Sequence, residues 1–236
     1  MDTKINNSKI QVKWVNLNRY LGEVDGLKTY LTCDEIERAA KYKFDRDRAR
    51  FIIGRALLRI MLGNILDFNP FQIEIESNNY GKLILSNIKQ QNLHFNLSHS
   101  QDYIIYAFCF NDEVGIDIEK IDTSINHLEI SENYFTDMEI EYLKDSADKD
   151  AIAKRFFTIW TRKEALLKAM GVGLAVDLKK IDVTTDSIDL SRGNIKLPSD
   201  ILKYWIVKNL FIEDEFKVAI SYSGAIRQVN VREYCS

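Results

Sequence analysis

The sequence predicts an α+β protein made of two similar halves, and two observations support this. The first is the order of the elements. A short helix, a long helix and β-hairpins occupy residues 1–110, and a similar order begins again in residues 111–236. The second is composition, because hydrophobic residues make up 46% of the 236 residues and aromatic residues 11%, which is ample for a packed core. No proline- or glycine-rich linker separates the halves, so we expect a soft boundary near residue 110 and tight packing across it.

The elements of the first half follow from periodicity and capping signals. Alternation predicts a strand over residues 10–17, and Thr32-Cys33-Asp34-Glu35 is a capping box that opens a helix running to about residue 44. A longer helix is expected over residues 45–62, with Gly63 closing it. Asn78-Asn79-Tyr80-Gly81 predicts a hairpin turn. Strands are expected over residues 73–76, 83–85, 94–98 and 103–110.

The second half opens with an alternating strand over residues 114–119. Thr136-Asp137-Met138-Glu139 is another capping box, which opens a short helix. A long helix is expected from about residue 150 to 170. Further strands are expected over residues 181–184, 204–208 and 216–222.

Composition argues against several classes of function. The net charge of −3 gives no general attraction to nucleic acid or to a membrane, and no apolar run approaches the length of a membrane-spanning helix. The first 14 residues lack the apolar core of a signal peptide, so we expect a cytoplasmic protein, and we expect a monomer. The three cysteines are far apart without C-x-x-C spacing, and the three histidines are too few to favour a zinc enzyme.

Two separated segments carry the strongest functional signal. In Val114-Gly115-Ile116-Asp117-Ile118-Glu119 the apolar and acidic residues alternate, so Asp117 and Glu119 share one face of a strand. Adjacent carboxylates repel, and a hard cation such as Mg²⁺ is the usual remedy. In the segment over residues 160–168, helical spacing places Glu164 and Lys168 one turn apart. Alone, such a strand is typical of a half-solvated sheet, and such a Glu–Lys pair is typical of surface electrostatics.

Together the two segments resemble a family pattern. G-[IV]-D-[IVL]-E followed by W-[STC]-x-K-E-[AS]-x-x-K is similar to the signature of the Sfp-type 4′-phosphopantetheinyl transferases, and Gly171 and Gly173 continue it as K-x-x-G-x-G-L. These enzymes move phosphopantetheine from coenzyme A onto a serine of a carrier protein. The resemblance implies a fold of two related α+β halves with the active site between them, although no internal sequence repeat is visible.

The resemblance also implies roles for the acidic and basic residues of these segments. Asp117, Glu119 and Glu164 would hold Mg²⁺, and Lys168 would contact the phosphate oxygens. Glu164, or a metal-bound water near it, is the candidate base for the serine hydroxyl.

A run of basic residues stands out in the first half. Between Arg38 and Arg59 the acidic residues Asp45 and Asp47 interrupt eight lysines and arginines, in a chain that is negative as a whole. The pattern alone fits a solvated helix pair or an anion site. The resemblance favours the anion site, because the family holds the 3′-phosphate of coenzyme A here. Arg50 is the closest match and Arg38 a looser one, whereas Glu35 stands where some relatives have another basic residue.

Two further strings match the family. Phe95-Asn96-Leu97-Ser98-His99-Ser100 fits F-N-x-S-H-S, which implies that Ser98 and His99 contact coenzyme A. Gly81-Lys82 resembles the family's G-K, in which the lysine reaches a phosphate, although Leu83 replaces the usual proline. The string G-x-S-x-G is absent, which argues against a serine hydrolase. A Walker A motif and G-x-G-x-x-G are absent too, which argues against P-loop and Rossmann chemistry.

The resemblance therefore predicts Mg²⁺-dependent transfer of 4′-phosphopantetheine from coenzyme A to an apo acyl or peptidyl carrier protein, with release of 3′,5′-ADP. Two alternatives remain open. One is another Mg²⁺ enzyme that acts on a nucleotide diphosphate, and the other is a non-catalytic module that binds coenzyme A or a carrier protein. Nothing in the sequence indicates which carrier is served.

Overall fold

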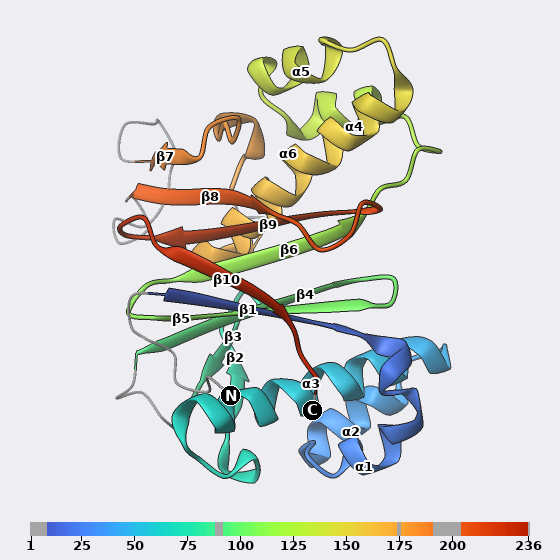
Figure 1. The fold of residues 1–236 in the computed structure, drawn as a ribbon, viewed down its shortest axis with the longest axis vertical. Coiled ribbons are helices and arrows are strands. Elements are labelled where there is room, and N and C mark those ends of the chain that lie inside the picture. Colours follow the sequence, from blue (N-terminus) through green and yellow to red (C-terminus); the bar gives the residue numbers. More distant parts are fainter. Residues whose placement is uncertain (1–8, 88–91, 174–175, 191–203, 236) are drawn as a thin grey trace.

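The computed structural model describes residues 9–87, 92–173, 176–190 and 204–235. Helices and strands alternate in two groups along the chain (Figure 1). The first group contains β1 (Lys9–Asn16), α1 (Val24–Lys28), α2 (Cys33–Ala40), α3 (Asp45–Leu66), β2 (Ile75–Ser77), β3 (Leu83–Leu85), β4 (Leu93–Ser100) and β5 (Tyr103–Phe110). The second group contains β6 (Val114–Lys120), α4 (His127–Tyr134), α5 (Asp137–Lys144), α6 (Lys149–Met170), β7 (Ser187–Asp189), β8 (Tyr204–Leu210), β9 (Phe216–Ser223) and β10 (Gln228–Glu233). Short 3₁₀ turns occupy Leu17–Arg19, Leu21–Glu23, Pro70–Gln72 and Leu178–Lys180.

Within the described residues, the strands form two four-stranded sheets and one hairpin. The first sheet has the order β10-β1-β5-β4, the second has the order β6-β9-β8-β7, and β2 pairs with β3. Among these described strands, all pairs are antiparallel except β1 with β10. Helices α1 to α3 lie at one end of the molecule and α4 to α6 at the other, with the two sheets between them (Figure 1). The α+β class predicted from the sequence is therefore confirmed.

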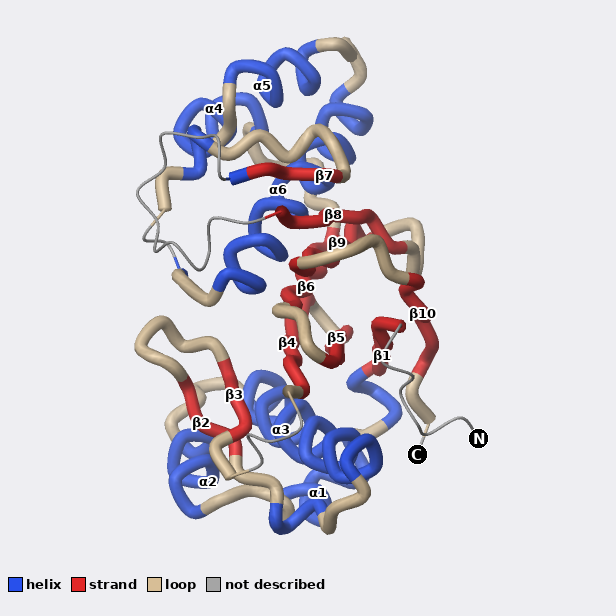
Figure 2. Tube along the Cα trace, turned by 90° about the vertical axis from the view of Figure 1, so that its left-hand side faces the viewer, coloured by secondary structure: helices blue, strands red, loops and turns tan. Residues whose placement is uncertain are grey.

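Strands β4 and β6 bring the two sheets together along their edges (Figure 2). The contacts use side chains of β4, because Asn96, Ser98 and Ser100 alternate with apolar or exposed positions and face β6. The Ile116 amide donates to Asn96 Oδ1 at 3.0 Å, and the Lys120 amide donates to Ser100 Oγ at 3.0 Å. The polar positions of the F-N-x-S-H-S string thus join the two halves.

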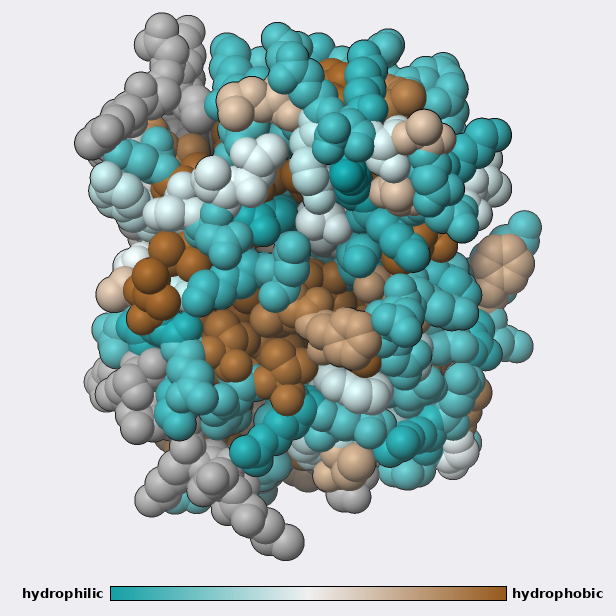
Figure 3. Space-filling view, turned by 45° about the horizontal axis from the view of Figure 1, so that its top comes forward, coloured by the Kyte–Doolittle hydropathy of each residue, from teal (hydrophilic) through white to brown (hydrophobic). Residues whose placement is uncertain are grey.

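Each long helix packs on one sheet, and a third core lies where the sheets meet. Helix α3 contributes Ile53 and Leu57 to the core of the first half, and α6 contributes Ile159 and Leu166 to the core of the second half. The third core combines strands of both sheets, including Ile10, Ile105, Ile116 and Ile220. On one face of the molecule, hydrophobic side chains gather in the middle with polar side chains around them (Figure 3). No described helix is long and apolar enough to cross a membrane.

Several element boundaries differ from the sequence expectation. Helix α3 does not close at Gly63 but runs to Leu66 and ends with Asp67 in the left-handed region at φ 60°. Helix α2 ends at Ala40 instead of residue 44. The strand expected over residues 73–76 begins later, as β2 at Ile75–Ser77, because a 3₁₀ turn occupies the preceding residues Pro70–Gln72.

The larger differences lie in the second half. Residues 181–184 do not form the expected strand, since the Val183 amide donates to the Glu139 carboxylate instead of a neighbouring strand. Strand β7 follows them, and α4 and β10 lie where the sequence analysis expected no element. Strand β10 returns to the first sheet, so the two sheets do not correspond to two continuous segments divided near residue 110.

Candidate active site

A cavity of about 910 Å³ lies between the two halves. Helices α2 and α3 line one end of it with Arg38, Arg50 and Arg55, and the β2–β3 hairpin contributes Lys82. Strands β4 and β6 and helix α6 line the rest. The structure thus brings together on one cavity every residue that the sequence suggested as a ligand of metal or donor, namely Arg38, Arg50, Lys82, Ser98, His99, Asp117, Glu119, Glu164 and Lys168.

Asp117 forms the centre of the acidic end. Asp117 is 2% exposed. Oδ1 accepts a hydrogen bond from Ser98 Oγ at 2.8 Å and an ion-paired hydrogen bond from Lys168 Nζ at 2.6 Å. Lys168 Nζ also lies 2.9 Å from Ser98 Oγ, so the three side chains form a closed triangle. Oδ2 of Asp117 is buried and has no hydrogen-bond partner among the described residues, which leaves one carboxylate oxygen with unused acceptor capacity.

The carboxyl groups around Asp117 are held in an environment that disfavours their charge. Burial raises the pKa of Asp117, although Lys168 and Ser98 oppose that rise. Burial and the neighbouring Asp117 raise the pKa of Glu119 to about 7 and also raise the pKa of Glu164. A site in which several buried carboxyls repel one another is suited to a multivalent cation.

The donor set fits Mg²⁺ in chemistry, but its members do not converge in this structure. Within the described residues, no three His, Cys, Asp or Glu side chains come together as metal ligands. The ammonium of Lys168 lies against Asp117 instead, and Glu119 Oε2 accepts a hydrogen bond from Ser100 Oγ at 3.1 Å. Carboxylate oxygens are the ligands that Mg²⁺ prefers, and Asp117 Oδ2 is available. Assignment of Asp117, Glu119 and Glu164 to a metal stays a prediction.

Close packing of α6 on β6 brings the acidic strand and the motif helix together. At Gly115 an added Cβ would lie 2.1 Å from the Ala165 carbonyl oxygen and 2.3 Å from the Ala169 amide nitrogen. Only glycine allows this approach of strand and helix. The glycine of the G-I-D-I-E string is therefore required for the distance at which Lys168 reaches Asp117.

The basic end of the cavity is built around Arg50 and Phe51 on α3. Arg50 donates to the Gln101 carbonyl at 3.1 Å and to Asp47 at 2.9 Å, and its side chain is 19% exposed. The guanidinium carbons of Arg38 and Arg55 lie 5.2 and 5.5 Å from the centre of the Phe51 ring. Three guanidinium groups therefore share this end, and planar guanidinium groups suit phosphate oxygens.

Arg55 is a candidate that the sequence treated only as part of the basic run. Its side chain is 12% exposed, and its Nε lies 3.7 Å from Glu35 Oε1. Glu35 also pairs with Arg59 at 2.7 Å. Glu35, the acidic residue that departs from the family pattern, thus pairs with Arg55 on the cavity wall and with Arg59, which does not line the cavity. Arg50 and Arg55 are five residues apart, a spacing that does not put two side chains on the same face of a helix. The sequence alone therefore could not predict that both line the cavity.

His99 and Lys82 also line the cavity, in different surroundings. Burial lowers the pKa of His99, and the nearby positive charges of Arg50 and Lys168 lower it further, so the neutral imidazole is favoured. The Lys82 ammonium pairs with Glu113 and donates to the Ala169 carbonyl at 2.7 Å. In this structure the Lys82 ammonium is therefore engaged by the protein itself, and its assignment to a phosphate stays a prediction.

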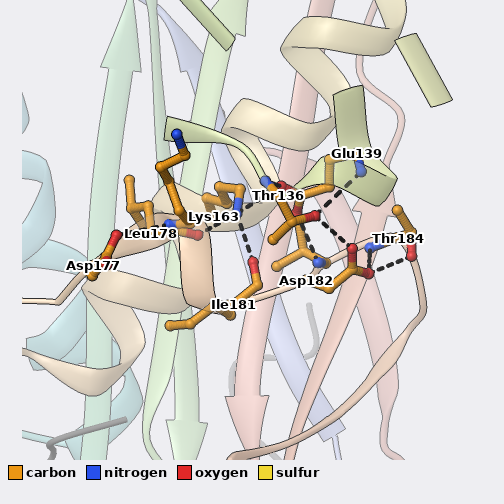
Figure 4. A network of polar contacts seen from close by, with 10 residues as sticks. Thr136, Glu139, Lys163, Asp177, Leu178, Ile181, Asp182 and Thr184 are labelled. Atoms are coloured by element: carbon orange, nitrogen blue, oxygen red, sulfur yellow. Dashed lines mark hydrogen bonds and ion pairs between the residues drawn. The ribbon is translucent and has the colours of Figure 1, made fainter. Parts of the chain in front are cut away.

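Lys163, next to Glu164 in the motif, has a structural role that the sequence analysis missed. Its ammonium donates to the Leu178 and Ile181 carbonyls at 2.8 and 2.6 Å and pairs with Glu139 at 2.8 Å (Figure 4). Both charged side chains are at most 1% exposed. This network attaches α6 to the start of α5 and to residues 177–184, on the side away from the cavity. A buried lysine of this kind needs its partners, which only the tertiary structure reveals.

Comparisons with known proteins find relatives that match both halves of the chain. Residues 21–111 match the family model "4′-phosphopantetheinyl transferase, N-terminal", and residues 113–220 match "4′-phosphopantetheinyl transferase superfamily". The 4′-phosphopantetheinyl transferase HetI of Nostoc sp. is 34% identical over 89% of this chain and 86% of its own length. The 4′-phosphopantetheinyl transferase ffp of Bacillus subtilis is 28% identical over 84% of each chain. A holo-(acyl-carrier-protein) synthase of Bacillus anthracis, solved in complex with CoA (3′,5′-ADP), is 23% identical and superposes with a TM-score of 0.35 over 43% of this chain and 93% of that chain.

The matches cover both halves of the molecule and define an enzyme of the transferase class. The chain belongs to the 4′-phosphopantetheinyl transferase family, as its two separated motifs predicted.

Proposed function

We propose that this protein transfers 4′-phosphopantetheine from coenzyme A to a serine of an apo acyl or peptidyl carrier protein in a Mg²⁺-dependent reaction, releasing 3′,5′-ADP. One observation carries the proposal. A single cavity between the halves combines a basic end on α3 with an acidic end on β6 and α6, as a donor with a remote phosphate and a reactive pyrophosphate requires.

At the basic end, Arg50 and Arg38 bind the 3′-phosphate of coenzyme A. Both side chains line the same end of the cavity, and Arg38 lies over the Phe51 ring. Two guanidinium groups there present several N–H donors to one anion, which supports this role. His99 and Ser98 contact the phosphate chain between the two ends. Lowering of the His99 pKa leaves its imidazole neutral, which allows it to donate one hydrogen bond without adding charge.

At the acidic end, Asp117, Glu119 and Glu164 would hold Mg²⁺. The ion would neutralise the pyrophosphate and the charge that develops on the leaving group. Lys168, which reaches Asp117 and Ser98, would add a positive charge at this end of the cavity.

Glu164 is the proposed acceptor of the serine proton. Its raised pKa, caused by burial and by Asp117, makes it a better base than an exposed carboxyl. The hydroxyl of serine is far less acidic than any carboxyl, so proton transfer accompanies attack on the β-phosphate and does not precede it. We further propose a monomeric, cytoplasmic enzyme. One chain supplies both walls of the cavity, which supports the monomer.

Intact-mass analysis tests the function. A panel of apo carrier proteins is incubated with the enzyme, coenzyme A and Mg²⁺, and a gain of one phosphopantetheine unit is expected on at least one of them. Glu164→Gln is the matched control and should leave the carriers unmodified. Consumption of coenzyme A without modified carrier would favour a nucleotide-diphosphate enzyme. Binding of coenzyme A without any turnover would favour a non-catalytic module.

A further inference from the structure

Lys82 joins three separate parts of the chain at one end of the cavity. Its side chain is 8% exposed. The ammonium donates to the Ala169 carbonyl in the last turn of α6 at 2.7 Å and pairs with Glu113, which lies between β5 and β6. Glu113 Oε1 in turn lies 3.3 Å from His94 Nδ1 on β4. The β2–β3 hairpin is thereby attached to the helix that carries Glu164 and Lys168.

Asn78 makes a second attachment between the same hairpin and the same helix. Its Oδ1 accepts hydrogen bonds from the Tyr80 and Lys82 amides, both at 2.9 Å, which fixes the turn. Its Nδ2 donates to the Gly171 carbonyl at 3.1 Å. Gly171 caps α6 with φ 66°, and a Cβ there would lie 3.0 Å from Lys82 Cδ. The hairpin and the helix end are therefore in close contact through both side chains.

The charges around Lys82 favour this contact. A cation at a helix C-terminus interacts favourably with the helix dipole and with the free carbonyl groups. Burial alone would raise the pKa of Glu113, but His94 and Lys82 outweigh burial and lower it to about 2, so Glu113 is ionised at neutral pH. Glu113 lines a separate cavity of about 260 Å³ with His94 and Met170, and it does not line the large cavity.

We propose that Lys82 is a positioning residue, which together with Glu113 and Asn78 holds the last turn of α6 so that Lys168 reaches Asp117 and the donor pyrophosphate. The proposal rests on the proposed function. It assigns Lys82 a positioning role in place of a direct contact with a phosphate. Lys168 directly precedes Ala169, whose carbonyl Lys82 binds, so a shift of this turn moves Lys168 with it. Contacts that are misplaced by a small distance lose much of their effect on a reaction.

Glu113 distinguishes the two roles of Lys82, because they predict opposite results for Glu113→Gln. If Lys82 acts through the attachment, this substitution weakens the attachment and lowers turnover. If Lys82 is a direct phosphate ligand, the substitution releases the ammonium toward the cavity and strengthens donor binding. Glu113→Gln keeps the shape of the side chain and removes its charge.

The experiment is a double-mutant cycle of Lys82→Gln and Glu113→Gln with two readouts. The first is hydrogen exchange of the peptide that contains the last turn of α6, measured without substrate. The second is kcat and KM for carrier modification, at a temperature at which each variant is folded by circular dichroism. We expect faster exchange and a roughly three- to tenfold lower kcat in each single variant, with the double variant no worse than the worse single one. Lys82→Arg should restore part of kcat.

Asn78→Asp is a second, nearly isosteric variant in case Lys82→Gln does not fold. It keeps the acceptor for the turn and loses the donor to the Gly171 carbonyl. It should also speed exchange and lower kcat. Unchanged exchange, tighter donor binding in Glu113→Gln, or additive losses would each overturn the proposal. A wild-type protein that modifies no carrier would instead refute the proposed function, and the exchange readout would still test the attachment.

Discussion

Asp117 uses its two carboxylate oxygens differently. Oδ1 is shared by Ser98 and Lys168, whereas Oδ2 is buried and finds no partner in the part of the chain that the structure describes. A buried acceptor without a partner carries an uncompensated desolvation cost. A cation bound at Oδ2 would offset that cost in the folded protein. Lys168 balances only part of the negative charge that Asp117, Glu119 and Glu164 bring to the site.

Glu119 should make stability depend on pH. Burial and Asp117 raise its pKa from 4.5 to about 7, so the folded protein keeps this proton to a higher pH than the unfolded chain does. Its contribution to stability is therefore complete below pH 4.5 and is lost as pH rises toward 7. Without divalent cations, the free energy of unfolding should fall across this window by on the order of 1–3 kcal/mol more in wild type than in Glu119→Gln.

Urea unfolding at several pH values in a chelating buffer measures this difference. Glu132→Gln, on an exposed position of α4, is the control and should behave as wild type does. Adding Mg²⁺ should stabilise wild type more at pH 7.5 than at pH 5, because the metal binds the ionised carboxyl. Equal slopes for wild type and Glu119→Gln would contradict the assignment.

Arg50 should act on donor binding more than on the chemical step. The 3′-phosphate is remote from the bond that breaks, so its contact is made equally in the ground and transition states. Arg50→Ala should raise KM for coenzyme A by about tenfold or more, with a smaller change in kcat, and should abolish most of the preference for coenzyme A over 3′-dephospho-coenzyme A. Steady-state kinetics with both donors checks this.

Arg46 supplies the control for Arg50. It lies on the same helix but donates to Asp102 at 2.7 Å and does not line the cavity. Arg46→Ala should leave the donor preference intact. If Arg50→Ala penalised both donors equally, Arg50 would not be the 3′-phosphate contact.

The residues of the cavity could be predicted from the sequence to different degrees. Asp117, Glu164 and Lys168 belong to strings whose spacing and family likeness both single them out, and all three line the same cavity. The engagement of Lys82 by Glu113 could not be foreseen, because these residues lie on a hairpin and a connection that only the tertiary structure brings together. The same holds for Lys163 and Glu139, which are buried as a pair.

At the level of elements, the contact between β6 and α6 determines the geometry of the acidic end. Gly115→Ala should destabilise the protein by about 3 kcal/mol or more, because its methyl group would overlap backbone atoms of α6 that cannot rotate away. Thermal unfolding checks the loss. Any folded fraction should transfer poorly, since α6 is displaced from Asp117.

Gly22 provides the matched control for Gly115. An added Cβ there meets no atom within 4 Å, so Gly22→Ala should change stability by less than about 0.5 kcal/mol. A Gly115→Ala variant as stable as Gly22→Ala would show that strand and helix can separate at little cost.

The long, strongly periodic elements were the predictable ones, and the errors have local causes. Helices α3 and α6 and the strand β6 follow from the periodicity of their apolar residues. The end of α3 was misplaced because glycine is tolerated inside a helix whose packing favours continuation. Residues 181–184 carry an apolar alternation typical of a strand, but Lys163 and Glu139 take their backbone groups.

At the scale of the whole molecule, the two halves share one core, and the chain passes between the two sheets twice, from β5 to β6 and from β9 to β10. Strands of both sheets contribute to the core that contains Ile10 and Ile220, and the side chains of β4 bond to the backbone of β6. The α+β class and the meeting of the motifs could be predicted. The pairing of β10 with β1 could not, because parallel partners from opposite ends of the chain leave no local signal.

The pairing of β10 with β1 also bears on synthesis. While the protein is being made, residues 9–14 leave the ribosome long before residues 228–233, to which they pair. Until then, one side of β1 offers unpaired amide and carbonyl groups to any strand that comes near. The nascent chain must therefore protect this open edge, by a chaperone or by delayed folding, until its last strand arrives.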